Sequence, residues 1–121
     1  MWGRRLLDDE VAALAETFRL LGDPNRLRIV LSCLDGPVGV GALAERVGLS
    51  RSLVSHHLRL LRATRLLKAG RAGRQVFYSL PDCHVRDMLT NLIEHVAEPH
   101  DHANEMENDD DGRDDGEVRL R

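Results

Sequence analysis

Apolar residues recur every three or four positions along most of residues 8–96, which is the spacing of one face of an α-helix. Glycine and proline interrupt this pattern at Gly22, at residues 35–37 (Asp-Gly-Pro) and at Gly48, where helices are expected to end. Asp23 and Ser50 each precede a periodic segment and have the side chains that helix N-caps prefer. The pattern therefore predicts helices over residues 8–21, 24–34, 40–47, 51–64 and 81–96.

The first predicted helix carries an apolar stripe made of Val11, Leu14, Phe18 and Leu21. The stripes of the second and fourth predicted helices are expected to face inward and to supply most of the core. Their expected core positions are Leu27, Val30, Leu31, Leu34, Leu53, Val54, Leu58 and Leu61, with Leu60 at the margin.

The third and fourth predicted helices form a helix-turn-helix pattern, because both are short and the turn between them, residues 48–50, contains glycine. Residues 68–80 come next, with residues 70–73 between two short strand-like runs. The second run, residues 75–78, is rich in strand formers, so this segment predicts a β-hairpin. The sequence thus predicts a mainly α fold with a small β-hairpin, the organisation of a winged helix-turn-helix.

Charge divides the chain into two parts. Residues 1–97 carry 14 lysines and arginines against 10 acidic residues, whereas residues 98–121 carry 3 against 10. We expect residues 1–98 to form one DNA-binding and dimerisation domain and residues 99–121 to form an acidic tail, too polar to fold. With two cysteines, no signal peptide and no apolar run of transmembrane length, a cytoplasmic location is expected.

The outward positions of residues 51–62 carry side chains that suit DNA. Ser52, Ser55 and His56 have the size and chemistry to contact base edges in the major groove. His57 is expected at the edge of this face, and it cannot chelate a metal together with His56 because adjacent helical residues point about 100° apart. The remaining candidates are arginines suited to phosphates: Arg51, Arg59 and Arg62 on the helix, and Arg71 and Arg74 at the hairpin tip.

The last predicted helix carries four metal-ligand residue types, in the order Asp82-x-His84 and His95-x-x-Glu98. His84 and His95 lie about 20° apart around such a helix but about 16 Å apart along it. Ligands must lie about 2.0–2.2 Å from a transition metal, so one helix cannot close the site. Two antiparallel copies can, and a two-fold axis then gives two sites per homodimer. The alternative is an ordinary helix whose polar side happens to hold these residues.

These segments together resemble the ArsR/SmtB family of metal-responsive winged-helix repressors. The resemblance covers residues 10–98 and rests on residues 21–29 at the entry to the second helix, residues 49–62 as a recognition helix and residues 70–78 as a wing. It implies a homodimer with zinc-sensor sites between the C-terminal helices, and Asp82, His84, His95 and Glu98 match that family's ligand pattern. We expect the N-terminal helix around Leu14 and Phe18 and the last predicted helix to form the dimer interface.

The resemblance also bears on the choice of metal. It implies that sensing of arsenic, cadmium or lead would use a cysteine pair in the helix before the recognition helix, and residues 40–47 contain no cysteine. His100 and His102, beyond Pro99, are similar to the extra tail ligands of nickel and cobalt sensors. Four nitrogen and oxygen ligands suit zinc and a larger set suits nickel or cobalt, so the divalent metal stays open between zinc and nickel, with cobalt also considered.

The sequence therefore predicts a homodimeric transcriptional repressor that binds an inverted-repeat DNA operator and is released or modulated by a divalent transition metal. Two alternatives stay open: a DNA-binding regulator that depends on a partner protein or on redox state, and a metal buffer with a vestigial DNA-binding fold. An enzyme is not expected, because no nucleophile is paired with a base and no phosphate-binding loop is present. The segment from His95 to His100 approaches an inverted zinc-protease motif, but Pro99 breaks it.

Overall fold

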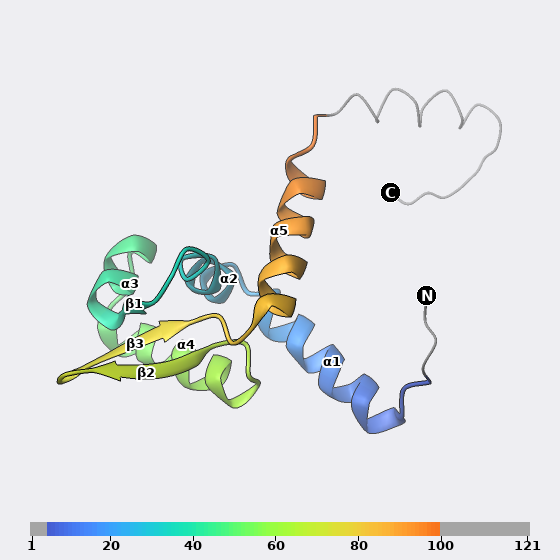
Figure 1. Cartoon of the computed structure of the whole chain (residues 1–121), viewed down its shortest axis with the longest axis horizontal. Helices are drawn as coiled ribbons and strands as arrows, with labels where there is room; N and C mark the ends of the chain where they lie inside the picture. Colours follow the sequence, from blue (N-terminus) through green and yellow to red (C-terminus); the bar gives the residue numbers. More distant parts are fainter. Residues whose placement is uncertain (1–4, 100–121) are drawn as a thin grey trace. The chain divides into compact units, whose positions relative to one another are not determined.

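The computed structural model describes residues 5–99, and its helices and strands are labelled in Figure 1. The chain divides into two compact units between Leu89 and Thr90, so the last helix begins in the first unit and continues into the second. Among the described residues, no helix is long and apolar enough to cross a membrane. The elements are α1 (Asp8–Leu21), α2 (Pro24–Leu31), β1 (Val38–Gly39), α3 (Val40–Val47), α4 (Arg51–Ala63), β2 (Lys68–Ala72), β3 (Gln75–Ser79) and α5 (Cys83–Ala97).

The predicted helix starts are confirmed where a cap marks them. The Asp23 carboxylate accepts a hydrogen bond from the Arg26 backbone N–H at 3.0 Å, and Pro24 follows at the first helical position of α2. Ser50 Oγ accepts from the Leu53 backbone N–H at 3.1 Å and caps α4. Between them, Gly48 ends α3 at a φ of +71°, a left-handed conformation that favours glycine. These residues fix the turn between α3 and α4.

The ends of two helices differ from the prediction. The second helix ends at Leu31 rather than at residue 34, because the chain tightens there into a turn in which Leu34 N–H donates to Leu31 O at 3.2 Å. The last helix begins at Cys83, and Asp82 lies just before it as the residue that caps it. Asp82 is therefore the capping residue of α5, and the carboxylate predicted to bind metal also accepts a backbone hydrogen bond.

The sheet is antiparallel and has the strand order β1-β3-β2. Ala72 pairs with Gln75, so the hairpin turns over two residues, Gly73 and Arg74, and Gly73 has the positive φ of +65° that such turns favour. The predicted turn at residues 70–73 is wrong, because Gly70 pairs with Phe77 and belongs to β2. The two-residue strand β1 was not predicted, since its strand character comes only from pairing with β3.

The core lies in the first unit, where α2, α3 and α4 pack together under the sheet. Leu20 and Ile29 are buried, although the sequence did not place them among the core positions. Conversely, Leu53 of α4, expected on the buried side, is 41% exposed. Val11, Leu14 and Phe18 on the apolar stripe of α1 are about half exposed. The buried apolar residues are Leu20, Ile29, Val30, Cys33, Val38, Leu43, Ala44, Val54, Leu58, Leu61, Leu66, Leu67, Leu80 and Leu89.

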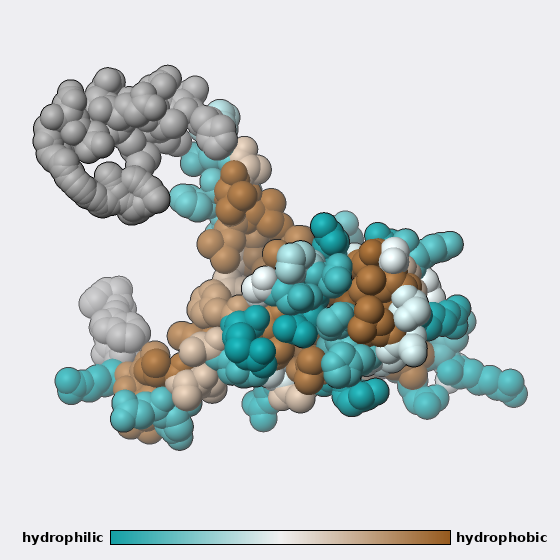
Figure 2. All heavy atoms as spheres, turned by 180° about the vertical axis from the view of Figure 1, so that it is seen from behind, coloured by the Kyte–Doolittle hydropathy of each residue, from teal (hydrophilic) through white to brown (hydrophobic). Residues whose placement is uncertain are grey.

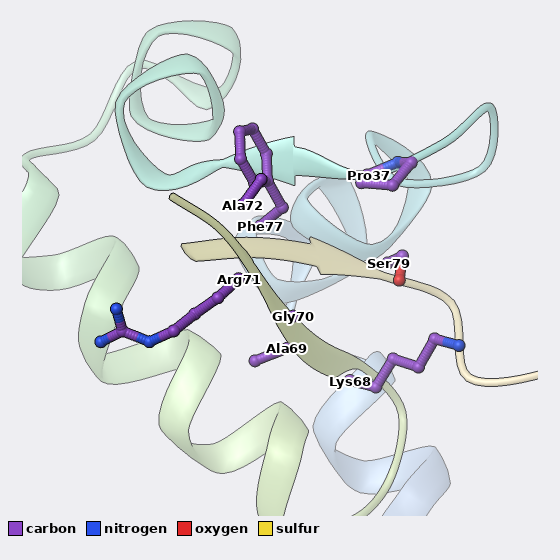
Figure 3. Close-up of a pocket in the computed structure, with 8 residues that line it drawn as sticks. All are labelled: Pro37, Lys68, Ala69, Gly70, Arg71, Ala72, Phe77 and Ser79. Carbon is purple, nitrogen blue, oxygen red and sulfur yellow. The ribbon is translucent and has the colours of Figure 1, made fainter. Parts of the chain in front are cut away.

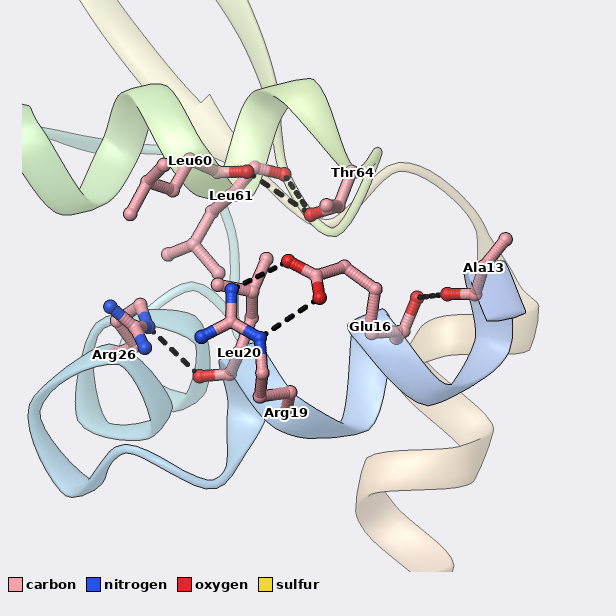
Figure 4. A network of polar contacts seen from close by, with 9 residues as sticks. Ala13, Glu16, Arg19, Leu20, Arg26, Leu60, Leu61 and Thr64 are labelled. Carbon is pink, nitrogen blue, oxygen red and sulfur yellow. Dashed lines mark hydrogen bonds and ion pairs between the residues drawn. The ribbon is translucent and has the colours of Figure 1, made fainter. Parts of the chain in front are cut away.

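A polar contact fixes the corner between α1 and α2 (Figure 4). Arg26 Nε donates to the carbonyl oxygen of Leu20 at 3.0 Å, which satisfies a carbonyl near the end of α1. Close by, the Arg19 guanidinium forms an ion pair with Glu16 at 2.6 Å, exposed on the surface of α1. The corner holds Asp23, the cap of α2, in place at the start of that helix.

Candidate DNA-binding surface and metal-ligand residues

Helix α4 presents one continuous polar face. Its buried side carries Val54, Leu58 and Leu61, none of which is more than 1% exposed. The opposite side carries the predicted DNA-contact residues: Arg51, Ser52, His56, Arg59 and Arg62 are exposed, and Ser55 is half-buried at the edge. Exposed donors on a helix that is held rigidly from behind can enter a groove, so this face can do what the sequence predicts of it.

His57 is not at the edge of this face, as the sequence suggested, but buried with only 8% of its surface exposed. Its Nδ1 has no hydrogen-bond partner among the described residues. Burial lowers the pKa of the His57 imidazole, and the nearby Arg26 charge lowers it further while Asp23 opposes the shift. His57 is therefore a neutral core residue, and its spacing from Val54 and Leu61 was the signal for that role.

Arg51 lies against α3, across the turn between the two helices. A Cβ atom built on Gly41 would lie 2.6 Å from Arg51 Nη2, so the guanidinium lies close against the backbone at Gly41 and would have to shift if a side chain were added there. The Arg51 side chain makes no hydrogen bond or ion pair within the described part of the chain, and its donors stay available. The contact holds a positive charge over the first turn of α3.

The hairpin places its two arginines differently from one another. Arg74 lies in the two-residue turn and is fully at the tip, as predicted. Arg71 lies within β2 opposite Val76, so its expected place at the tip is wrong by one residue pair, although it remains exposed. In Figure 3 the Arg71 side chain extends away from the strands on the side of α4. Both arginines thus belong to the hairpin that follows α4.

A cavity of about 360 Å³ lies against the hairpin (Figure 3). Phe77 and Ser79 of β3 and the small residues of β2 form much of its wall, and Lys68 and Arg71 supply its charges. Its lining holds no histidine, cysteine or carboxylate, so it offers no metal ligand and no general base. The candidate chemistry of this chain lies elsewhere.

The start of α5 brings two of the predicted metal ligands together. Asp82 Oδ1 lies 3.7 Å from His84 Nδ1, and both side chains are exposed, His84 to 90%. The same carboxylate oxygen accepts a hydrogen bond from the Val85 backbone N–H at 3.1 Å. This bond holds Asp82 at the helix start while its other oxygen remains free of that contact.

His95 and Glu98 are exposed and lie at the other end of α5 and just beyond it. No group of three or more histidine, cysteine or carboxylate side chains comes together within residues 5–99. One chain therefore does not assemble the four predicted ligands, as the spacing along one helix requires. His100 and His102 lie outside the described residues.

Two helices expose apolar side chains that the fold of one chain does not cover. On α1 these are Val11, Leu14 and Phe18, at 48–52% exposure. On the second half of α5, the exposed apolar residues are Leu92, Ile93 and Val96, at 40–76% exposure. Figure 2 shows the corresponding apolar surface on both helices. Apolar faces of this kind mark association surfaces.

The fold and the exposed basic face define a winged helix-turn-helix protein, and comparison with known proteins identifies its family. Residues 23–69 match the family model described as bacterial regulatory protein, arsR family. The chain is 43% identical over 95 residues to the HTH-type transcriptional regulator NmtR of Mycobacterium tuberculosis, across 78% of this chain and 79% of that protein. It is 41% identical over 90 residues to a transcriptional repressor SmtB homolog of Synechocystis sp., across 74% and 68%.

Solved structures agree. The cadmium metal-sensor CMTR from Mycobacterium tuberculosis matches with a TM-score of 0.58 and 45% identity, over 70% of this chain and 85% of that one. The homodimeric winged helix-turn-helix DNA-binding domain of a candidate ArsR-family regulator from Mycobacterium bovis matches with a TM-score of 0.66 and 25% identity, over 83% and 97%. The chain belongs to the ArsR family of bacterial regulatory proteins, as its motifs predicted. It is a transcriptional regulator and not an enzyme.

Proposed function

We propose that this chain is a homodimeric, metal-responsive transcriptional repressor that acts in the cytoplasm and binds an inverted-repeat operator. Residues 1–98 are the DNA-binding and dimerisation domain, and the acidic residues 99–121 form a tail. The observation that carries the proposal is the pair Asp82 and His84, 3.7 Å apart and exposed at one end of α5, with His95 and Glu98 exposed toward the other. Relatives described as a transcriptional repressor and as a cadmium sensor support it.

The donor set fits a divalent transition metal. Two ligands that each lie about 2.0–2.2 Å from one ion are separated by roughly 3–3.6 Å, close to the Asp82–His84 spacing. The highly exposed His84 can close the small difference by rotating its side chain. Two imidazoles and two carboxylates would suit zinc, and His100 and His102 would extend the set toward the six ligands that nickel or cobalt prefers. When bound, the metal would supply a cross-link between two α5 helices.

The apolar faces of α1 and α5 support the homodimer. A matching fold is described as homodimeric in the Mycobacterium bovis relative. We assign Val11, Leu14 and Phe18 of α1 and Leu92, Ile93 and Val96 of α5 to the interface, because on each helix three large apolar side chains are left exposed. An antiparallel pairing of two α5 helices would bring Asp82 and His84 of one chain to His95 and Glu98 of the other.

On DNA, we assign base contacts to Ser52, Ser55 and His56, and phosphate contacts to the arginines Arg51, Arg59, Arg62, Arg71 and Arg74. A dimer fixes the separation of two α4 helices, and an inverted repeat would match that separation. Metal binding at the α5 helices would shift this separation and weaken the fit. Such coupling between two sites amounts to about 5–150-fold in affinity and acts in both directions.

Operator binding measured with and without metal tests the proposal. Fluorescence anisotropy at fixed salt would follow the full chain on DNA from its own promoter region, first without metal and then with zinc, nickel or cobalt. We expect one metal to weaken binding at least about tenfold. His95→Gln should bind the same DNA but lose that response, whereas Glu94→Gln, the exposed neighbour, should keep it. Tight binding that is indifferent to every metal would favour a partner-dependent regulator instead.

A tail variant separates the metals. If His100 and His102 complete a larger ligand set, changing both to glutamine should lower the affinity for nickel or cobalt more than the affinity for zinc. Equal loss for all three metals, or no loss, would remove these two residues from the site.

A further inference from the structure

The turn that follows α2 joins the first turn of α5 to the helix-turn-helix. Arg86 Nη1, from α5, donates a hydrogen bond to the carbonyl oxygen of Leu34. Arg46 Nη1, from the last turn of α3, donates to the carbonyl oxygen of Ser32 at 3.0 Å. Two arginines from different helices therefore bind carbonyls only two residues apart.

This turn is firmly held in the first unit. Cys33, between the two carbonyls, is fully buried, and burial raises the pKa of its thiol to about 11, so it stays a neutral apolar anchor. Ser32 Oγ donates to the Arg28 carbonyl at 2.8 Å, and Cys33 N–H donates to Val30 O at 3.0 Å. Carbonyls at a helix end have no partner within the helix, and guanidinium groups bind them favourably there. Because these hydrogen bonds hold the turn, we expect a shift of one arginine to move the turn and, with it, the other arginine.

Arg86 is also tied to the predicted metal ligands. It lies two residues after His84, and its backbone N–H donates to the Asp82 carbonyl at 3.4 Å. The Asp82 carboxylate caps the same first turn through Val85. Any displacement of Asp82 and His84 that moves this turn therefore moves the Arg86 side chain at its contact with Leu34. On the far side, Arg46 belongs to α3, which packs against α4.

We propose that Arg86 is a positioning residue that couples metal occupancy at Asp82 and His84 to the placement of the helix-turn-helix, through the turn at residues 32–34 and Arg46. The inference rests on the proposed function and adds to it the residue that carries the response. Arg86 binds neither metal nor DNA in this scheme, because its guanidinium is engaged with Leu34. Replacing Arg86 should therefore leave metal binding and DNA binding intact but remove the effect of one on the other.

The test compares Arg86→Gln with Arg28→Gln in the full chain. Both variants remove one positive charge, and Arg28 is a matched control because its side chain is exposed and hydrogen-bonded only to Asn25 of its own helix. Operator affinity would be measured by anisotropy without metal and with the effective metal. Metal affinity without DNA would be measured by competition with a chromophoric chelator.

For Arg86→Gln we expect metal affinity and metal-free operator affinity within about threefold of the unmodified chain. The metal-induced weakening should fall from at least about tenfold to below about threefold. Arg28→Gln should keep the full response, and Arg46→Gln, at the other end of the path, should reduce it. Full coupling in Arg86→Gln, or equal loss in Arg28→Gln, overturns the inference and leaves the proposed function standing. An unmodified chain that shows no metal response overturns the proposed function and this inference with it.

Discussion

Helices α4 and α5 differ in how much of their task one chain completes. On α4, Val54, Leu58 and Leu61 are at most 1% exposed and the polar side faces outward, so most of the apolar side of the helix packs against its own chain. On the second half of α5 the large apolar residues stay exposed, and the predicted ligands at its two ends are not brought together. The comparison teaches that one folded chain completes the packing of α4, the proposed DNA-reading helix, whereas the proposed sensing site on α5 would need a second copy.

The largest expected effect is a loss of folding stability when the core under α4 is disrupted. Leu61 is fully buried in the core under α4, so Leu61→Ala should leave a cavity and lower the free energy of unfolding by about 2–5 kcal/mol. Denaturant unfolding measures the loss, and it should not depend strongly on protein concentration. Leu92→Ala on α5 is the contrasting variant, because Leu92 is 47% exposed. Its smaller loss should shrink on dilution toward the monomer, because the substituted side chain then has no partner to meet. A loss that stays the same at concentrations where the unmodified chain is monomeric would contradict the assignment of Leu92 to an interface.

The next effect concerns association. Phe18→Glu places a charge on the apolar face of α1, where Phe18 is 52% exposed in a single chain. If this face is a dimer interface, the variant should be monomeric and should lose about a hundredfold in operator affinity, since two half-sites are no longer bound together. Sedimentation and anisotropy measure the two changes. Thr17→Glu is the control on the same helix, with the same added charge one residue away.

A Phe18→Glu chain that still forms dimers would place the interface elsewhere. A variant that is monomeric but keeps its operator affinity would show that dimerisation does not serve DNA binding.

The sequence could predict most of the scaffold because short-range signals mark it. Asp23, Gly48 and Ser50 act through bonds to neighbouring residues, so the helix-turn-helix boundaries were predictable. What escaped prediction depends on distant partners. The strand β1 exists only through β3, and the turn register at Gly73 follows from pairing along the hairpin.

The apolar stripe of α1 illustrates the same limit. Helical periodicity reveals that Val11, Leu14 and Phe18 share a face, but it cannot tell a face that enters the core from one that meets a partner. For α5, the ligand types and their spacing were readable, and the structure adds the closeness of Asp82 and His84. The assembly of all four ligands stays a prediction, since it depends on a second chain.

The smallest expected effect tests whether α4 is as self-sufficient as its packing indicates. Burial lowers the pKa of His57, with the Arg26 and His56 charges acting in the same direction and Asp23 against it. The unfolded chain binds a proton at this residue below about pH 6.5, whereas the folded chain resists it. Protonation of His57 therefore does not affect the free energy of unfolding above that pH, and it lowers the free energy of unfolding as the pH falls below it. His57→Leu removes the imidazole that binds this proton, and with it the buried Nδ1 that has no partner among the described residues.

The variant should be at least as stable as the unmodified chain at pH 7.5, because a buried polar atom without a partner is costly. It should also lose less stability between pH 7.5 and pH 5.5 when unfolding midpoints in denaturant are compared at the two values. His56→Gln changes the exposed neighbour and serves as the matched variant. If His57→Leu lost as much stability on acidification as the unmodified chain, His57 would have to be solvated in solution. Water would then reach the buried side of α4, although Leu58 and Leu61 on that side are buried.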